Sequence, residues 1–353
     1  MSVGDFDESP DAATTRSVEE LASWHSDWSG LRVAVLGLGV TGFSVADTLT
    51  ELGAEVLVFS RAHDDHREQL LEVIGARLAP STAGETELAD FEPELLVVSP
   101  GFPAEHPLVL WAEEAEVPVW GDVELAWRLR DKVGTPADWL VVTGSQGAAE
   151  TARLAEAMML AGGLRVLACG DSQVPVLDAI RDPLGWDAIV LSLSAPQLHY
   201  TRSVSPFSSA FISSGAGYSG WHATPEEFHR AAARAYTNTT IACVYNRADA
   251  VTMRSLEEAE VIDGCRAIGI GLDIPGPSDF GIVEGILCDR AFLDDRQASA
   301  LELTTVEELA TAGITGAESA TRVLAAAALA RSYGVAVAAI HDSLAPGTDT
   351  PLS

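Results

Sequence analysis

The sequence predicts an α/β protein built from two consecutive domains. From Leu31 onward, a β-branched apolar run, a glycine-bearing turn and an amphipathic stretch recur in the same order. Apolar strands that alternate with helices in this way form a parallel sheet covered on both faces. A polar segment with Gly and Pro, DKVGTPAD at residues 131–138, separates two such series and is expected to be a linker. Of the 353 residues, 47% are apolar, so each domain can bury a core.

The first domain is expected at residues 30–133, after a leader. Residues 1–29 are polar and acidic, and apart from a short helix around Val18 to Trp24 they are predicted to be mostly mobile. Strands are predicted at RVAVLG, EVLVFS, LLVVSPG and VPVWGD. Helices are expected between and after these strands, near residues 41–52, 64–76, 106–115 and 122–130.

The second domain is expected at residues 138–335. Its predicted strands are WLVVTGSQG, RVLACG, DAIVLSLS, SAFISSG and TIACVYN, and β-rich segments follow around GIVEGILCDRAFL. A helix is predicted from about Ala317 to Tyr333, and it ends at Gly334. The tail at residues 336–353 is too short to make a third domain.

Composition excludes several classes of partner. The chain has 21 basic and 52 acidic residues, a net charge of −31, which repels nucleic acid and anionic membrane surfaces. It has no signal peptide and no apolar span long enough to cross a bilayer, so we expect a cytoplasmic protein without membrane insertion. The four cysteines are isolated in the sequence and are predicted to be buried core thiols in a reducing compartment: Cys169, Cys243, Cys265 and Cys288.

No metal site is predicted. The eight histidines show no HExxH motif and no paired i, i+4 spacing, and the cysteines form no CxxC pair. His63 and His66 flank two aspartates, a pattern more typical of an exposed turn than of a ligand set.

A glycine-rich turn opens the first predicted helix. Gly37, Gly39 and Gly42 in VLGLGVTG have the G-x-G-x-x-G spacing that lets backbone N–H groups approach a phosphate at a helix N-terminus. The second strand ends in Ser60 and Arg61, where an NAD-binding fold places an acid, and this pair suits a ribose 2′-phosphate instead. The turn is therefore compatible with NADP binding, or with glycines that only permit close packing of helix and strand.

A second candidate loop, VVTGSQGAAET at residues 141–151, lies where a strand meets a helix. A working phosphate loop needs a lysine after its second glycine, followed by a hydroxyl that holds Mg²⁺. Ala148 and Ala149 occupy these two positions, and Lys132 is the chain's single lysine. We therefore expect no tight binding of ATP·Mg²⁺.

Together these stretches resemble the Mur ligases, ATP-dependent ligases that attach amino acids to the muramyl peptide precursor, and in particular the branch that adds D-glutamate. In the first domain the resemblance is carried by VAVLGLGVTGFSVADTL, LLVVSPGFPAEHPLV and VPVWGDVELAWRL. In the second it is carried by WLVVTG, SLSAPQLHYT, GWHAT and IACVYN. The resemblance covers about residues 31–335 and implies a Rossmann-like domain that binds a UDP precursor, followed by the central P-loop-type α/β domain of the family. The family's third domain, which binds the incoming amino acid, is expected to be missing here.

The resemblance also implies which family residues have changed. Where the family loop reads TGTNGKTT, residues 143–150 read TGSQGAAE, and the GNIG stretch has become GDSQ. Ser192 stands at the family's magnesium-binding glutamate, Tyr218 at its metal-binding histidine and Ala232 at the lysine that it carbamylates. ATP and Mg²⁺ are the family's cofactors, and this joint loss predicts that neither is used here.

By the same resemblance, five residues of the first domain contact the UDP part of the precursor: Val40, Thr41, Ser99, Pro100 and Gly101. Ser60 replaces the acid that usually contacts uracil in the family. The implied ligand is UDP-MurNAc-L-alanine or a related UDP-sugar, and the implied protein partner is another enzyme of cell-wall synthesis.

Three functions remain open from the sequence. The preferred hypothesis is a pseudoenzyme of peptidoglycan synthesis that binds a precursor or a partner without ligating D-glutamate. The first alternative is an active ligase, or a split one whose third domain comes from a separate chain. The second is an NADP-binding oxidoreductase, although no Tyr-x-x-x-Lys pair is present for hydride transfer.

Overall fold

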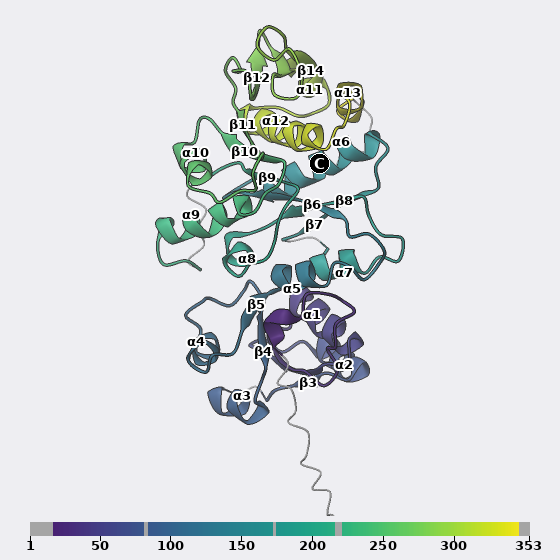
Figure 1. Cartoon of the computed structure of the whole chain (residues 1–353), viewed down its shortest axis with the longest axis vertical. Helices are drawn as coiled ribbons and strands as arrows, with labels where there is room; N and C mark the ends of the chain where they lie inside the picture. Colours follow the sequence, from purple (N-terminus) through teal and green to yellow (C-terminus); the bar gives the residue numbers. More distant parts are fainter. Residues whose placement is uncertain (1–16, 81–83, 172–173, 216–220, 346–353) are drawn as a thin grey trace, which may run out of the picture.

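The structure is a computed structural model that describes residues 17–80, 84–171, 174–215 and 221–345, with a separate sheet in each half of the chain (Figure 1). The first sheet has five parallel strands in the order β3-β2-β1-β4-β5. Its strands are β1 (Arg32–Leu36), β2 (Glu55–Phe59), β3 (Arg77–Leu78), β4 (Leu95–Val98) and β5 (Val119–Gly121). Its helices are α1 (Val40–Glu51), α2 (Asp65–Ile74), α3 (Glu85–Phe91), α4 (Pro107–Glu114) and α5 (Asp122–Arg128).

Alternate residues of the central strands face two different cores. Val33 and Val35 of β1 pack in one core, whereas Ala34 and Leu36 of the same strand pack in another on the opposite face. All four side chains are fully buried. This alternation confirms the parallel sheet covered on both faces that the continuous apolar runs predict. The short elements α3 and β3 are absent from the predicted series.

The second sheet is mixed and has nine strands in the order β14-β13-β12-β11-β10-β9-β6-β8-β7. Strands β6 to β12 pair in parallel, and β12, β13 and β14 form an antiparallel meander. The strands are β6 (Asp138–Thr143), β7 (Val166–Gly170), β8 (Ala188–Ser192), β9 (Ser208–Phe211), β10 (Ala242–Asn246), β11 (Arg266–Ile270), β12 (Asp279–Val283), β13 (Ile286–Asp289) and β14 (Leu301–Thr305).

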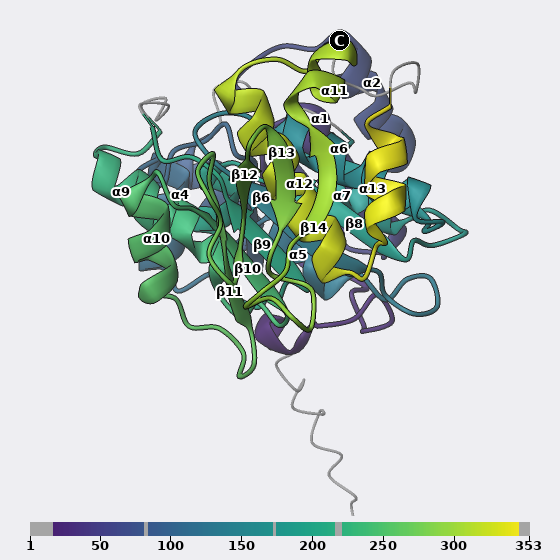
Figure 2. The ribbon, with the colours of Figure 1, turned by 90° about the horizontal axis from the view of Figure 1, so that it is seen from above.

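Helices cover the second sheet as well. They are α6 (Ala148–Ala161), α7 (Val176–Ile180), α8 (Ala195–His199), α9 (Pro225–Ala233), α10 (Ala250–Glu257), α11 (Val306–Thr311), α12 (Ala317–Ser332) and α13 (Val337–Ser343). A 3-10 turn, η2 (Arg234–Tyr236), follows α9. Helix α12 lies against α6, and its run of alanines is fully buried because small side chains allow close approach. Figure 2 shows α9 and α10 on one side of α12 and α13 on the other.

Residues 17–29 depart from the predicted mobile leader. They contain the 3-10 turn η1 (Val18–Glu20), and Trp28 is buried with its Nε1 donating to the carbonyl of Ser23 at 2.9 Å. The backbone N–H of Trp24 donates to Asp131 at 2.7 Å. These residues therefore form part of the first domain's core, and apolar burial outweighs their polar flanks. Residues 1–16 lie outside the described part of the chain.

The segment after residue 335 also joins the second core. Helix α13 packs against α6, and Ile340 is fully buried there. The predicted tail therefore belongs to the second domain at least as far as Ala345, the last residue that the structure describes.

The two domains meet through buried polar contacts and an aromatic pair. Glu124 of α5 is buried and accepts hydrogen bonds from the backbone N–H groups of Arg202 and Ser203 in the second domain, at 2.8 and 3.0 Å. Trp127 of α5 lies edge to face with Trp139 of β6, with ring centroids 5.0 Å apart. These contacts fix the first domain on the second.

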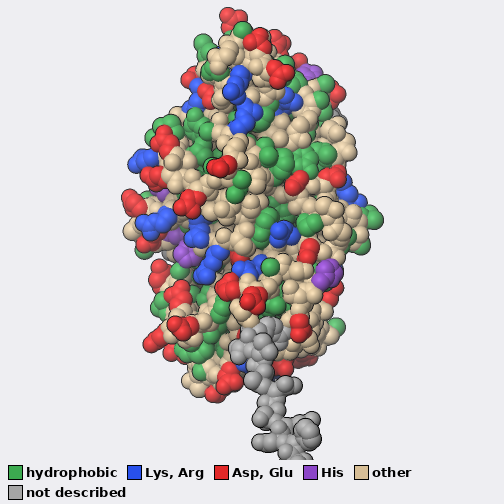
Figure 3. Space-filling model, in the orientation of Figure 1, with side chains coloured by type: hydrophobic (Ala, Val, Ile, Leu, Met, Phe, Trp, Pro, Cys, Tyr) green, Lys and Arg blue, Asp and Glu red, His purple; other side chains and the backbone are tan. Residues whose placement is uncertain are grey.

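Acidic and basic side chains are interspersed on the face of the molecule drawn in Figure 3. On that face the net charge is spread over both domains.

Candidate functional site

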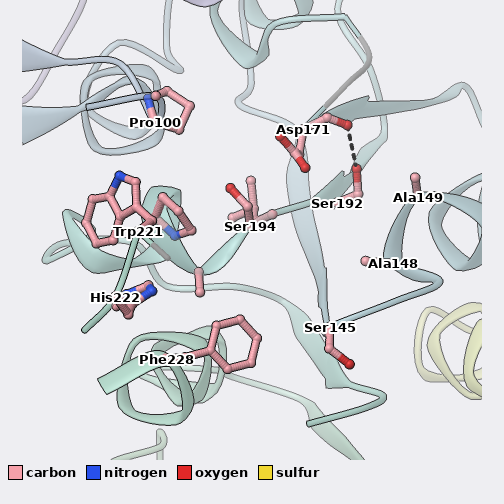
Figure 4. A pocket seen from close by; sticks show the side chains of 15 residues that line it. Pro100, Ser145, Ala148, Ala149, Asp171, Ser192, Ser194, Trp221, His222 and Phe228 are labelled. Atoms are coloured by element: carbon pink, nitrogen blue, oxygen red, sulfur yellow. Dashed lines mark hydrogen bonds between the residues drawn. The ribbon is translucent and has the colours of Figure 1, made fainter. Parts of the chain in front are cut away.

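A cavity of about 460 Å³ lies between the two domains. The first domain contributes Pro100 and Gly101, from the turn after β4. The second domain contributes the loop after β6, the ends of β7 and β8, and residues near α9 (Figure 4). These are Gly144, Ser145, Ala148, Ala149, Asp171, Ser192, Leu193, Ser194, Ala195, Pro196, Trp221, His222 and Phe228. We call this cavity the interdomain cleft.

The predicted phosphate loop keeps its backbone frame at the edge of this cleft. Gly147 has a φ of +79°, a conformation that favours glycine, and α6 begins at the next residue. The backbone N–H of Ser145 donates to the carbonyl of Ser213 at 2.9 Å, which ties the loop to the end of β9. Ala148 and Ala149 line the cleft with methyl groups. The loop can therefore present backbone N–H groups, but it has neither the cation nor the metal-binding hydroxyl of a working phosphate loop.

The side chains at the ends of β7 and β8 give the cleft a carboxyl group without a basic partner. Ser192 Oγ lies 3.5 Å from the carbonyls of Cys169 and Asp171, a long contact. Burial raises the pKa of the Asp171 carboxyl above its usual range. Sequence reasoning did not select Asp171, although it lies in the altered GDSQ stretch.

A second carboxyl group is buried behind the cleft, on α5. Asp122 Oδ2 accepts a hydrogen bond from Gln197 Nε2 at 3.0 Å, whereas its Oδ1 has no hydrogen-bond partner. Burial raises the pKa of Asp122 to about 6. Both carboxyl groups disfavour anions while ionised, and neither is paired with an arginine or lysine among the described residues.

Of the two remaining family positions, Ala232 is described and Tyr218 lies outside the described residues. Ala232 is fully buried on α9 in an apolar cluster that includes Phe211 and Tyr236. It does not line the interdomain cleft; Phe228, one helical turn earlier, does. Because its surroundings are filled by aromatic side chains, this position offers no ligand to a metal.

The first domain's glycine-rich turn is closely packed. Gly37 has a φ of +112°, and a Cβ at Gly42 would overlap the Gly37 carbonyl oxygen. Ser99 lies against both glycines, and its buried Oγ has no hydrogen-bond partner. Gly39 is the N-cap of α1, and a Cβ added there would meet open space within 4 Å. The structure thus brings Gly37, Gly42 and Ser99 together.

The other residues predicted to bind UDP are divided between the helix and the cleft. Val40 and Thr41 form the first turn of α1, where Val40 is exposed. Pro100 and Gly101 line the interdomain cleft instead.

Arg61 lies beside the cleft-lining turn. Its guanidinium sits over the ring of Phe102, 4.4 Å from the centroid. Ser60 Oγ donates to the carbonyl of Ala62 at 2.6 Å. His106 packs edge to face on Phe102, and burial, together with the Arg61 charge, lowers the pKa of this imidazole.

The structure adds two aromatic residues that sequence reasoning did not assign to the site. Trp221 Nε1 donates to the carbonyl of Phe102 at 2.8 Å, so a second-domain side chain closes on the first domain. His222 stacks against Trp221 at 4.5 Å and is 6% exposed, with no hydrogen-bond partner for Nε2. Burial lowers the pKa of His222 below its usual range. The GWHAT stretch was the only sequence signal for them.

One arginine lies near the loop, outside the interdomain cleft. A Cβ at Gly147 would be 2.5 Å from Arg322 Nε of α12. Arg322 lines a separate cavity of about 320 Å³ with Gln146 and Asn246, and it pairs with Glu318 at 3.3 Å. Glu318 is 80% exposed, so this is a weak surface ion pair, and the Arg322 guanidinium lies beside the loop without lining the interdomain cleft.

The described cleft residues do not fit ATP·Mg²⁺. Stabilising a triphosphate requires cations, and clamping magnesium requires correctly placed oxygens from ionised side chains. The cleft offers serine hydroxyls, a histidine of lowered pKa and a single carboxyl group. Such a lining suits neutral polar groups of a ligand better than a polyphosphate.

No helix in the described ranges is both long and apolar enough to cross a membrane.

Comparisons with known proteins agree with this architecture. A family model described as "Mur ligase MurD-like, N-terminal domain" matches residues 31–121. A crystal structure of the Mpl ligase from Neisseria meningitides superposes with a TM-score of 0.54, at 14% identity over 90% of this chain and 98% of that one. The Mpl ligase of Psychrobacter arcticus gives a TM-score of 0.52, at 13% identity over 89% of this chain and 68% of that one. At such identities, these two likenesses concern the fold alone.

Curated relatives named UDP-N-acetylmuramoylalanine–D-glutamate ligase are much closer in sequence. The relative from Leifsonia xyli is 55% identical over 346 residues, which are 94% of this chain and 67% of the relative. The relative from Streptomyces coelicolor is 41% identical over 323 residues, covering 90% of this chain and 67% of the relative. The chain thus spans about two thirds of the length of these relatives. By its sequence and its two-sheet architecture, the chain belongs to the MurD group of the Mur ligase family.

Proposed function

We propose that this chain is a cytoplasmic, non-ligating MurD relative that binds a UDP-muramyl precursor, UDP-MurNAc-L-alanine or a related UDP-sugar. The observation that carries the proposal is the joint change of the ATP and metal positions around one cleft. Ala148, Ala149 and Ser192 lie together there, and each lacks the group that the family uses. A neighbouring residue can compensate for the loss of one ATP-binding or metal-binding group. When several such groups are lost from the same site, ATP and metal binding are lost together.

Electrostatics supports the loss of nucleotide chemistry. Acyl-phosphate formation depends on cations that neutralise the phosphates as charge moves in the transition state. The ionisable side chain that lines this cleft at the strand ends is Asp171. When it is ionised, its negative charge would oppose a phosphate. Arg322, on the other side of the loop, lines a separate cavity and not this cleft.

The first domain supports retention of precursor binding. Its glycine turn keeps the positive φ at Gly37 and the close approach of Gly42 that such a turn needs. The enclosed Oγ of Ser99 has no hydrogen-bond partner, so the turn keeps one unsatisfied polar atom beside Gly37. Pro100 and Gly101, two of the residues expected to contact UDP, lie at the border of the interdomain cleft.

The decisive experiment is calorimetric titration of the chain with UDP-MurNAc-L-alanine and, separately, with ATP·Mg²⁺ in the same buffer. We expect binding of the precursor and none of the nucleotide. A parallel assay supplies both ligands with D-glutamate, and an active MurD serves as positive control. Ligation by this chain would overturn the proposal; absence of precursor binding would also overturn it, and would favour a scaffold that acts through protein contacts with another cell-wall enzyme.

A matched variant tests the electrostatic argument. The double substitution Ala148→Lys with Ala149→Thr returns the loop cation and hydroxyl without touching the first domain. We expect it to bind ATP·Mg²⁺ roughly tenfold or more tightly than the parent chain, because a charged hydrogen bond to phosphate is regained. Precursor affinity should stay the same in both proteins.

A further inference from the structure

Two of the four cysteines, which the sequence separates, are in contact in the fold. Cys243 Sγ lies 3.7 Å from Cys265 Sγ. Cys243 lies on β10, and Cys265 immediately precedes β11, its parallel neighbour in the sheet. These thiols are far apart in the sequence, and the pairing of β10 with β11 brings them together; the predicted burial is wrong for Cys265, which is only partly buried.

The two thiols differ in exposure. Cys243 is fully buried, whereas Cys265 is only partly buried and follows an exposed turn at residues 261–264. A reagent can thus reach Cys265 first, with Cys243 directly behind it. This arrangement of an accessible thiol in front of a second one is typical of redox-sensitive pairs.

Their surroundings favour a thiolate on the outer cysteine. The contact between the two thiols lowers the pKa of Cys265 and raises the pKa of Cys243. Cys243 Sγ also lies 3.5 Å from Ser209 Oγ, which bonds to Thr239 Oγ1 at 2.9 Å. The outer sulfur is therefore the nucleophile, and the inner one can attack it next.

We infer that Cys243 and Cys265 form a reversible dithiol modification site, which a hydroperoxide converts to a disulfide. The Cys265 thiolate attacks the hydroxyl oxygen of the peroxide and the O–O bond breaks, which gives a sulfenic acid; the departing alkoxide or hydroxide takes up the proton that the Cys265 thiol released on ionising and leaves as an alcohol or water. Cys243 sulfur then attacks Cys265 sulfur; the S–O bond breaks and hydroxide leaves with the Cys243 proton as water. Two electrons pass from the thiols to the peroxide, and a dithiol reductant reverses the change.

The bond would close a loop that contains α10, since the cysteines are 22 positions apart in the sequence. It would join β10 to the residue that precedes β11, and the two sulfurs, now 3.7 Å apart, would have to approach to about 2 Å. The inference is independent of the proposed precursor binding, because neither thiol lines the interdomain cleft.

The test is treatment of the full chain with hydrogen peroxide, alkylation of the remaining thiols and peptide mass spectrometry. We expect a linked pair of peptides carrying Cys243 and Cys265, lighter than the two thiol peptides by two hydrogen atoms. The double variant C169S/C288S is the matched control and should give the same linked pair. Cys265 that stays reduced, or that advances to sulfinic acid without linkage in this variant, would overturn the inference.

Single variants identify the order of events. In C243S we expect Cys265 to stop at a sulfenic acid that dimedone traps, and in C265S we expect Cys243 to stay reduced. Phenylarsine oxide, which two adjacent thiols chelate with loss of water, provides a second measurement that requires no oxidation. It should bind C169S/C288S roughly tenfold or more tightly than C243S, and equal binding would count against the pair.

Discussion

Asp122 has a buried carboxyl group that pairs with no arginine or lysine of the described residues. Gln197 donates to it, and burial raises its pKa from 3.8 to about 6. In the unfolded chain this carboxyl ionises near 3.8, so between pH 4 and 6 the folded state binds more protons. Its contribution to stability is therefore full at low pH and is lost as the pH rises through this window.

The substitution Asp122→Asn should prevent this loss of stability at higher pH. An amide keeps an acceptor for Gln197 and carries no charge, so we expect D122N to be more stable than the parent at pH 7.5, by up to about 3 kcal/mol. The measurement is thermal unfolding of both proteins from pH 4 to 8. Their difference should grow between pH 4 and 6, and a constant difference would contradict the assignment to Asp122.

Gly42 shows how closely one residue can be constrained. A methyl group there would overlap the backbone carbonyl of Gly37, which cannot move without disturbing the turn. We expect Gly42→Ala to lower the free energy of unfolding by about 2–4 kcal/mol. Gly39→Ala is the control, since Gly39 has ordinary φ and an open neighbourhood, and urea unfolding should separate the two variants. Equal stability would mean that the helix shifts to accept the methyl group.

At the scale of elements, the segment before β1 acts as a piece of the first core. Val18, Leu21 and Trp28 are buried there, and Arg128 of α5 donates to the carbonyl of Glu19 at 2.9 Å. Composition predicted mobility for this segment because most of its side chains are polar. The burial of a few large apolar residues decided the outcome.

Trp28→Ala should reveal this anchoring. Loss of a fully packed indole costs about 3–5 kcal/mol, and unfolding of the first domain should shift to lower urea concentration by a corresponding amount. His25→Ala is the matched control, because His25 is exposed in the same segment. If Trp28→Ala and His25→Ala unfolded at the same urea concentration, the segment would not contribute to the core.

The regular elements could be predicted from the sequence, and their long-range contacts could not. Strands such as β1 and β4 are mostly apolar runs rich in valine, and the predicted α12 ends within a residue of the observed helix. In contrast, Trp221 contacts Phe102 across 119 positions of sequence, and no local pattern encodes that contact. The same limit applies to the cysteine pair, which depends on the order of strands in the second sheet.

The candidate site was predictable where a family position could be matched in the chain. Ala148, Ala149 and Ser192 indeed lie around one cleft, whereas Ala232 lies in an apolar cluster away from its lining. Asp171 and His222 were missed because a lone acid or histidine carries no signal until its burial and neighbours are known.

At the scale of the whole molecule, the buried side chain of Glu124 connects the two domains by hydrogen bonds. Burial alone would raise its pKa, but hydrogen bonds from Ser203, Arg202 and Arg128 outweigh burial and hold the pKa below its usual range. Its stabilising contribution is therefore present above the pKa of the unfolded chain and is lost as the pH falls through the folded value.

Glu124→Gln should weaken the contact between the two domains. The amide turns one acceptor into a donor that faces other donors, and removing one partner of a buried charge pair costs about 3–5 kcal/mol. We expect calorimetric unfolding at pH 7.5 to shift to lower temperature and to separate into two transitions. Glu20→Gln makes the same chemical change on an exposed side chain and should stay within about 0.5 kcal/mol of the parent. A single unfolding transition of E124Q at the parent's temperature would show that other contacts hold the two domains together.

The edge-to-face indoles of Trp127 and Trp139 allow the contact between the two domains to be followed by circular dichroism. Their ring centroids are 5.0 Å apart and their planes meet at 80°, a chiral arrangement in which excited states couple and split. Because one ring belongs to each domain, a circular-dichroism couplet from this pair would disappear when the domains part, even if each kept its own fold. Separation of the halves can therefore be followed without attaching a label.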